Sequence, residues 1–203
     1  DGIRDYKVTG VQTCALPICW QALLDRGTRV VLPDATLADR VDRARAAVLL
    51  DADGGPDQVA ALEDWGFDTE AEYAWHGLRL RDRRGARRRP EPRAAAWPED
   101  DAAFLVALRQ VLVRDAGPGI ELLADHPDAW LGQGCEVHDA PTRHGLVSFA
   151  LRWHGERPAL LWEVSDPRPD LVITCPGLDP SWSSRTASGE ALLAPPVSRP
   201  AAG

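Results

Sequence analysis

Two adjacent carboxylates beside a tryptophan are the strongest candidate for chemistry in this sequence. Glu63, Asp64 and Trp65 are consecutive, and Asp68 follows three residues later. Hydrolysis of a glycosidic bond uses one carboxyl group to protonate the leaving oxygen and a second to attack or to activate water. An aromatic ring commonly stacks on the sugar. We therefore take Glu63 and Asp64 as candidate catalytic residues and Trp65 as a candidate substrate-binding residue; the alternative is that the acids only end a helix beside a loop.

Two further tryptophans are candidate sugar platforms. The chain has eight tryptophans in 203 residues, and Trp130 and Trp182 lie near predicted turns. An exposed indole at a turn offers a flat apolar face to a sugar ring. The competing interpretation is packing in the core, where large aromatic side chains are mostly found.

The residues with metal-ligand chemistry are not spaced for a metal site. Cys135 and His138 are three residues apart in a segment with strand-like alternation. Side chains three apart on a strand point to opposite faces of the sheet, so these two cannot bind one ion together. The sequence also lacks a phosphate-binding glycine loop, and Ser181 and Ser183 have no Gly-x-Ser-x-Gly setting. We predict no metal and no cofactor.

The charge balance points away from nucleic acid. An arginine-rich stretch runs over 79–93, but Asp82, Pro90, Glu91 and Pro92 interrupt it, and the formal net charge of the chain is −8. An acidic protein is not expected to bind nucleic acid in general. We interpret the stretch as a solvated helix end that leads into a linker, with an acidic partner as the alternative. No apolar run approaches the ~20 residues that span a bilayer, so no membrane contact is expected.

The first eighteen residues, Asp1 to Ile18, resemble a translated sequencing adapter. Val8 to Ile18 reads back into the codons of a common index adapter, and Asp1 to Asp5 matches its other end, with Tyr6 and Lys7 in the place of the index. Downstream there is no Lys, Met or Asn although Arg is frequent, which is typical of a high-GC, actinobacterial genome. We exclude this segment from the fold and predict that it is disordered.

Cysteine usage leaves localisation open, with the cytoplasm favoured. Cys14 belongs to the adapter and Cys19 to the junction, so Cys135 and Cys175 remain. Two cysteines do not form a disulfide framework. An export signal at the natural N-terminus would have been lost with it.

From residue 19 onward the sequence divides into a part with helical periodicity and a part with strand-like alternation. Over 19–116 apolar residues recur at helical spacing, with Asp34 as a predicted N-cap, Pro56 in a first turn, Asp68 or Thr69 as a cap, and a fourth helix that opens at Pro98. Over 117–194 the pattern predicts short antiparallel strands, at 119–123, 135–139, 171–175 and 190–193 among others. We predict a disordered tail at 195–203.

A hairpin at 147–164 is the clearest structural signal. A tight turn at Gly155 and Glu156 would place Leu151 opposite Leu160, and in the same register Phe149 opposite Trp162 and Val147 opposite Val164. Glycine at the first central position suits a type II′ turn. The predicted class is α+β: amphipathic helices followed by an antiparallel β-sandwich.

The second half resembles a known domain. The run HPDAWLGQGCEVHDAPTRHGLVSFALRWHGERPALLWEV, together with Pro176–Trp182 and Gly189–Leu193, is similar to the C-terminal β-domain that follows an (α/α) barrel in bacterial glycoside hydrolases. The resemblance covers about Pro98 to Ala194, and the earlier helices resemble such barrels less specifically. It implies carbohydrate as the partner, but none of its motifs carries a catalytic residue to transfer.

This resemblance leads us to expect a fragment. Four helices cannot close a barrel of paired helices, so the chain would lack the N-terminal part of its own protein and be inactive by itself. The β-domain would then buttress a helical catalytic domain. The alternatives are a non-catalytic carbohydrate-binding module and a structural or interaction module.

Overall fold

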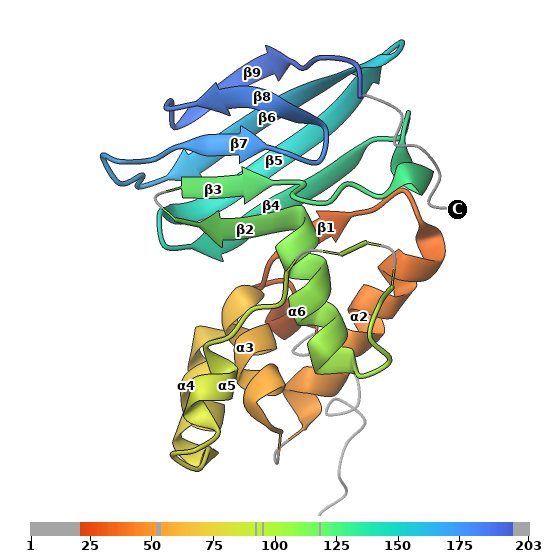
Figure 1. Ribbon diagram of the computed structural model, residues 1–203. Helices are drawn as coiled ribbons and strands as arrows, with labels where there is room; N and C mark the ends of the chain where they lie inside the picture. The colour runs from red at the N-terminus through yellow and green to blue at the C-terminus, as the bar shows by residue number, and fades with distance from the viewer. Residues whose placement is uncertain (1–20, 52–53, 92, 95, 118, 197–203) are drawn as a thin grey trace, which may run out of the picture.

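Two β-sheets and a group of helices make up the chain in the computed structural model, which describes residues 21–51, 54–91, 93–94, 96–117 and 119–196 (Figure 1). The helices are α2 (Ala35–Leu50), α3 (Pro56–Asp64), α4 (Asp68–Gly77), α5 (Arg83–Ala86) and α6 (Asp101–Leu112), with a 3-10 turn η1 (Asp128–Trp130). The strands are β1 (Arg29–Val31), β2 (Val113–Ala116), β3 (Gly119–Leu122), β4 (Cys135–Thr142), β5 (Gly145–His154), β6 (Arg157–Ser165), β7 (Ile173–Cys175), β8 (Asp179–Ser184) and β9 (Ser188–Leu192). The predicted α+β class is confirmed. The adapter-like segment 1–18 and residues 197–203 of the predicted tail lie outside the described residues.

Helices α2 and α6 begin where an aspartate side chain satisfies a backbone N–H group of the first turn. Asp34 Oδ1 accepts a hydrogen bond from Leu37 N at 3.0 Å, as the sequence predicts for an N-cap. Pro56 occupies the first turn of α3. The helix expected to open at Pro98 begins later, because Asp100 is its cap and accepts from Ala103 N at 2.8 Å. The predicted cap at Asp68 or Thr69 is wrong, because both residues lie inside α4 and its N-cap, Phe67, makes no side-chain cap bond.

Helix α6 runs directly into strand β2. The sequence suggests that the helix closes at Arg114 and Gly117, but it ends at Leu112 and Val113 already pairs with Leu122 of β3. The change is a tertiary effect, since the hydrogen bonds that β3 offers replace those of a further helical turn. No break therefore separates the last helix from the sandwich.

The strands form two sheets that face each other. One sheet has the order β1-β4-β5-β6-β9 and is antiparallel throughout, and the other has the order β2-β3-β7-β8, in which β3 and β7 are parallel. Strands β2 and β8 were not among those named from the sequence. The inner faces pack as one core with apolar side chains from both sheets: Val137, Val147, Phe149, Leu151, Leu160, Trp162, Val164, Ile120, Leu122 and Ile173.

The hairpin formed by β5 and β6 has the register that the sequence predicts. Leu151 pairs with Leu160, Phe149 with Trp162 and Val147 with Val164. Gly155 has a φ of +64° and Glu156 does not have a positive φ, which is the pattern of a type II′ turn. Alternation along one buried face fixes this register, because a slip of one residue would expose every apolar side chain.

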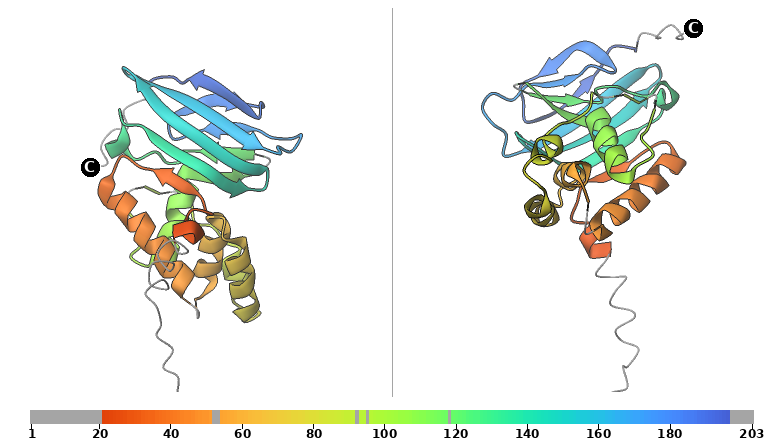
Figure 2. Two further views of the ribbon diagram at one scale, coloured as in Figure 1. Left: turned by 180° about the vertical axis from the view of Figure 1, so that it is seen from behind. Right: turned by 60° about the horizontal axis from the view of Figure 1, so that its bottom comes forward.

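The helices lie together on one side of the sandwich, beside β1 and β2 (Figures 1 and 2). Buried side chains of α2, α3 and α6 belong to the same apolar cluster as those of the two sheets. The core is thus continuous across the boundary at 116/117, and β1, from the predicted helical segment, pairs with β4. None of the described helices is long and apolar enough to cross a membrane.

Candidate functional site

Glu63 and Asp64 lie at the C-terminal end of α3. The helix ends in a Schellman motif, in which Phe67 N donates to Leu62 O at 2.9 Å and Gly66 N donates to Glu63 O at 3.3 Å. Gly66 has a φ of +80°, the left-handed conformation that this motif requires. This ending turns the chain sharply and leaves the two carboxylates at the border between the helices and the sandwich.

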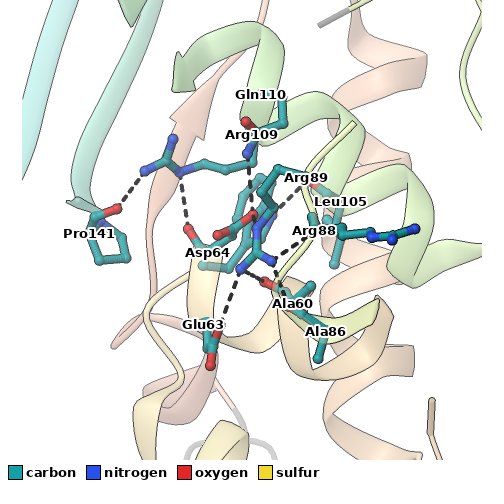
Figure 3. Close-up of polar contacts among 11 residues, drawn as sticks. Ala60, Glu63, Asp64, Ala86, Arg88, Arg89, Leu105, Arg109, Gln110 and Pro141 are labelled. Atoms are coloured by element: carbon teal, nitrogen blue, oxygen red, sulfur yellow. Dashed lines mark hydrogen bonds and ion pairs between the residues drawn. The ribbon is translucent and has the colours of Figure 1, made fainter. Parts of the chain in front are cut away.

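Arg89 binds both candidate catalytic carboxylates (Figure 3). Its Nε lies 2.7 Å from Asp64 Oδ2 and its Nη2 lies 3.1 Å from Glu63 Oε2, while Nη1 donates to Ala86 O at 2.7 Å. Burial alone would lower the pKa of Arg89, but the Asp64 and Glu63 carboxylates outweigh it and raise this pKa. The arrangement is a fixed ion pair between α3 and the segment after α5.

Trp65 is a core residue. Its side chain is 1% exposed, and its Nε1 donates to Leu105 O of α6 at 3.0 Å. Its backbone oxygen accepts from Thr28 N at 2.8 Å. The indole thus fixes α6 and the start of β1 against the end of α3 and has no face open to a ligand.

The two predicted sugar platforms do not form an exposed pair. Trp130 in η1 is 3% exposed and stands edge-on to His126, with 6.1 Å between ring centroids. Trp182 on β8 is half-buried and packs edge-on against Trp162 at 5.2 Å. Trp130 is thus closed to a ligand by burial, whereas Trp182 remains partly exposed.

The cysteines and His138 lie as the strand pattern predicts. Cys135 is buried in the core, whereas His138 on the other face of β4 contacts Glu136 Oε2 at 3.0 Å. Burial raises the pKa of the Cys135 and Cys175 thiols to about 12. Within the described residues, no group of three or more histidines, cysteines and acids is placed to hold a metal ion.

Arg109 and Gln110 are the site residues that the sequence analysis missed. They were left outside the predicted apolar face of α6, yet they are only 3% and 5% exposed. Arg109 Nε donates to Asp64 O at 3.1 Å and its Nη2 donates to Pro141 O of β4 at 2.5 Å (Figure 3). Burial lowers the pKa of Arg109, against the opposing effect of Asp64 and Asp115. The signal was available in α6 itself, since a helix with apolar residues around most of its circumference is packed on most sides.

A cavity of about 250 Å³ opens at this junction. Its lining is almost entirely charged or amide side chains: Glu63, Asp64, Arg87, Arg89, Arg109, Gln110 and Asp115. A larger cavity of about 540 Å³ is also lined by Arg89, together with Arg88 and Arg93, and has a mostly apolar floor that includes Ala103, Val106 and Ala107. The smaller cavity is the one whose lining is polar throughout.

Comparisons with models of protein families, with curated protein sequences and with solved structures gave no match for this chain. The geometry of the described residues and the sequence resemblance therefore carry the functional argument.

We expect that Arg109→Met lowers the free energy of unfolding by about 2–4 kcal/mol, because Asp64 O and Pro141 O lose their buried donors. Urea denaturation followed by tryptophan fluorescence measures this loss. Arg29→Met is the matched control: its ion pair with Asp139, at 3.4 Å, is more than half exposed on both sides, and such pairs contribute about 0.5 kcal/mol or less. Equal and small losses for both variants would refute the role given to Arg109.

Proposed function

We propose that this chain is the C-terminal, structural part of a glycoside-hydrolase-like, carbohydrate-active protein. In this role the β-sandwich buttresses a helical domain, and the chain has no glycosidase activity by itself. The resemblance of about Pro98 to Ala194 supports the carbohydrate connection. The observation that carries the buttress role is the contact of Arg109, which joins α3 and α6 to β4.

The covalent connection supports the same role. Helix α6 continues into β2 without a linker, so a displacement of the helix would pull on the sheet. Strand β1 enters the other sheet from the helical segment and pairs with β4. Two chain crossings and one buried guanidinium therefore hold the helices to the sandwich, which is the mechanical requirement for a buttress.

The site geometry favours support over catalysis. Both candidate carboxylates accept from Arg89, and the candidate stacking residue Trp65 is buried. A free carboxyl pair and an open aromatic face are what glycoside hydrolysis needs. The burial of Trp130 likewise speaks against the alternative of a carbohydrate-binding platform.

If the β-sandwich buttresses the helices, a substitution that destabilises the sandwich must destabilise the helices as well. Leu160→Ala removes a fully buried side chain from β6 and is expected to lower stability by about 2–5 kcal/mol. Native-state hydrogen exchange should show the same loss for amides of α3 and α6 as for amides of β5 and β6. Leu161→Ala, the next residue and 40% exposed on the outer face, is the control and should change little. Unchanged protection of the helices in Leu160→Ala would contradict the buttress role.

Assays with a panel of α- and β-linked glycosides test whether the chain is inactive. We expect no release of reducing sugar, because Arg89 holds the candidate carboxylates in ion pairs. If hydrolysis is observed and is lost in Asp64→Asn but kept in Asp68→Asn, Asp64 is catalytic and the purely structural role is wrong.

Long-read sequencing of the source genome across the Ile18/Cys19 junction tests the proposed origin. We expect a continuous reading frame upstream that encodes several more helical pairs with inward-facing carboxylates, because about four helices cannot close an (α/α) barrel. A start codon just before Trp20 would show that no barrel precedes this chain and would overturn the glycosidase connection.

A further inference from the structure

The polar cavity at the junction is lined by equal numbers of arginines and carboxylates, but the ion pairs are not shared evenly among the arginines. Asp64 and Glu63 are paired with Arg89. Asp115 lies 3.6 Å from Arg143 Nε and also accepts from the backbone N of Arg143 at 3.1 Å. Each carboxylate of the lining thus already has a cation.

Two guanidinium groups remain. Among the described residues, neither Arg87 nor Arg109 has a carboxylate oxygen within ion-pair distance, although both line the cavity. The lining itself holds three guanidinium groups and three carboxylates, but the carboxylates form their ion pairs with Arg89 and with Arg143, which does not line the cavity. The donors of Arg87 and Arg109 are therefore not taken up by ion pairs and favour an anion over a cation.

Arg109 supplies the buried part of the site. Its side chain is 3% exposed, and its hydrogen bonds go to two backbone carbonyls, Asp64 O and Pro141 O. Figure 3 shows its third nitrogen, Nη1, without an interaction to any residue drawn. The electrostatic attraction of Asp64 and Asp115 only partly offsets the burial of this charge, and an anion at Nη1 would offset more of that cost.

Gln110 and Arg87 supply the remaining donors. The Gln110 amide is 5% exposed, and its only contact with Asp64 Oδ2 is long, at 3.5 Å. Its N–H groups are thus weakly engaged in the wall of the cavity. Arg87 is exposed and stacks on the Trp75 ring, with 5.2 Å from its guanidinium carbon to the centroid. Stacking limits the rotamers of this arginine and reduces the entropy that binding would cost.

We propose that this cavity binds a small oxyanion, a carboxylate or a phosphate, through Arg109, Gln110 and Arg87. Guanidinium groups present donors in a planar fork that matches the oxygens of both anions. The volume of about 250 Å³ accommodates a group of that size. The neighbouring cavity of about 540 Å³ is also lined by arginines, Arg88, Arg89 and Arg93, but most of its wall is apolar.

Titration with inorganic phosphate at constant ionic strength tests the proposal, with chloride as the balancing anion. Amide signals of Asp64, Gln110 and Arg87 in NMR spectra of the whole chain should shift and saturate, and the melting temperature should rise. A second titration with acetate distinguishes the two classes of anion. The anion with the lower dissociation constant, phosphate or acetate, identifies the class that the site prefers. Shifts that grow linearly and without saturation for both anions would overturn the site, because screening alone gives that response.

Two variants and a matched control make the test specific. Gln110→Glu keeps the shape of the wall but adds a negative charge, and it should abolish saturable binding. Arg87→Gln, at an exposed position, should weaken binding about tenfold without a folding defect. Arg83→Gln is the control: Arg83 also stacks on Trp75, at 5.3 Å, but does not line the cavity, so it should bind like the unmodified chain. Equal affinity in Arg87→Gln and Arg83→Gln would refute the assignment.

Discussion

A buried guanidinium has to find acceptors inside the protein, and Arg109 finds them in two different layers. From α6 it reaches the last carbonyl of α3, that of Asp64, and the carbonyl of Pro141 in β4. Both acceptors are backbone atoms whose positions depend on where their elements end or bend. The contact can form only when α3, α6 and β4 are all in place, so it acts as a geometric constraint on the junction. Trp65 supports it from the other side through Leu105 O and Thr28 N.

This constraint explains why Asp64, a candidate catalytic residue, is engaged in contacts that hold the fold together. Asp64 gives its backbone oxygen to Arg109 and its carboxylate to Arg89. The carboxylate also lies near Gln110 Nε2, at 3.5 Å. One acidic residue thus organises three donors from two elements, α6 and the segment after α5. An aspartate in that position has a structural role through its geometry, with no proton transfer required.

The features that depend on residues close in sequence, the hairpin register and some helix starts, could be predicted from the sequence. The register of β5 and β6 follows from the alternation of Val147, Phe149 and Leu151 against their partners. The cap at Asp34 and the place of Pro56 in a first turn follow from helix-end chemistry. Strand β2 and the parallel pair of β3 and β7 could not be read in this way. The residues of β2 were read as the last turn of α6, and local alternation places a strand without naming the strand that it pairs with.

The candidate site was predictable in its residue types but not in its connections. The arginine-rich stretch looked like a solvated helix end, and Arg87 is indeed exposed, yet Arg89 of the same stretch is only 22% exposed and pairs with Asp64 across 25 residues of sequence. The apolar character of most of α6 could have signalled that Arg109 is buried, but its acceptors, Asp64 O and Pro141 O, lie on other elements and could not be named from that pattern.

The junction and the proposed anion site share one electrostatic cause. Among the described residues, the guanidinium that ties the layers together forms no ion pair, and it lines a cavity with one donor group, Nη1, outside its two backbone contacts. A ligand that binds only the folded form stabilises it in proportion to its concentration and affinity. An oxyanion at Arg109 would therefore strengthen the contact between helices and sandwich, because the Nη1 group it binds belongs to the same rigid plane as the two nitrogens that hold Asp64 and Pro141. Occupancy of the cavity and rigidity of the junction are thus linked through a single side chain.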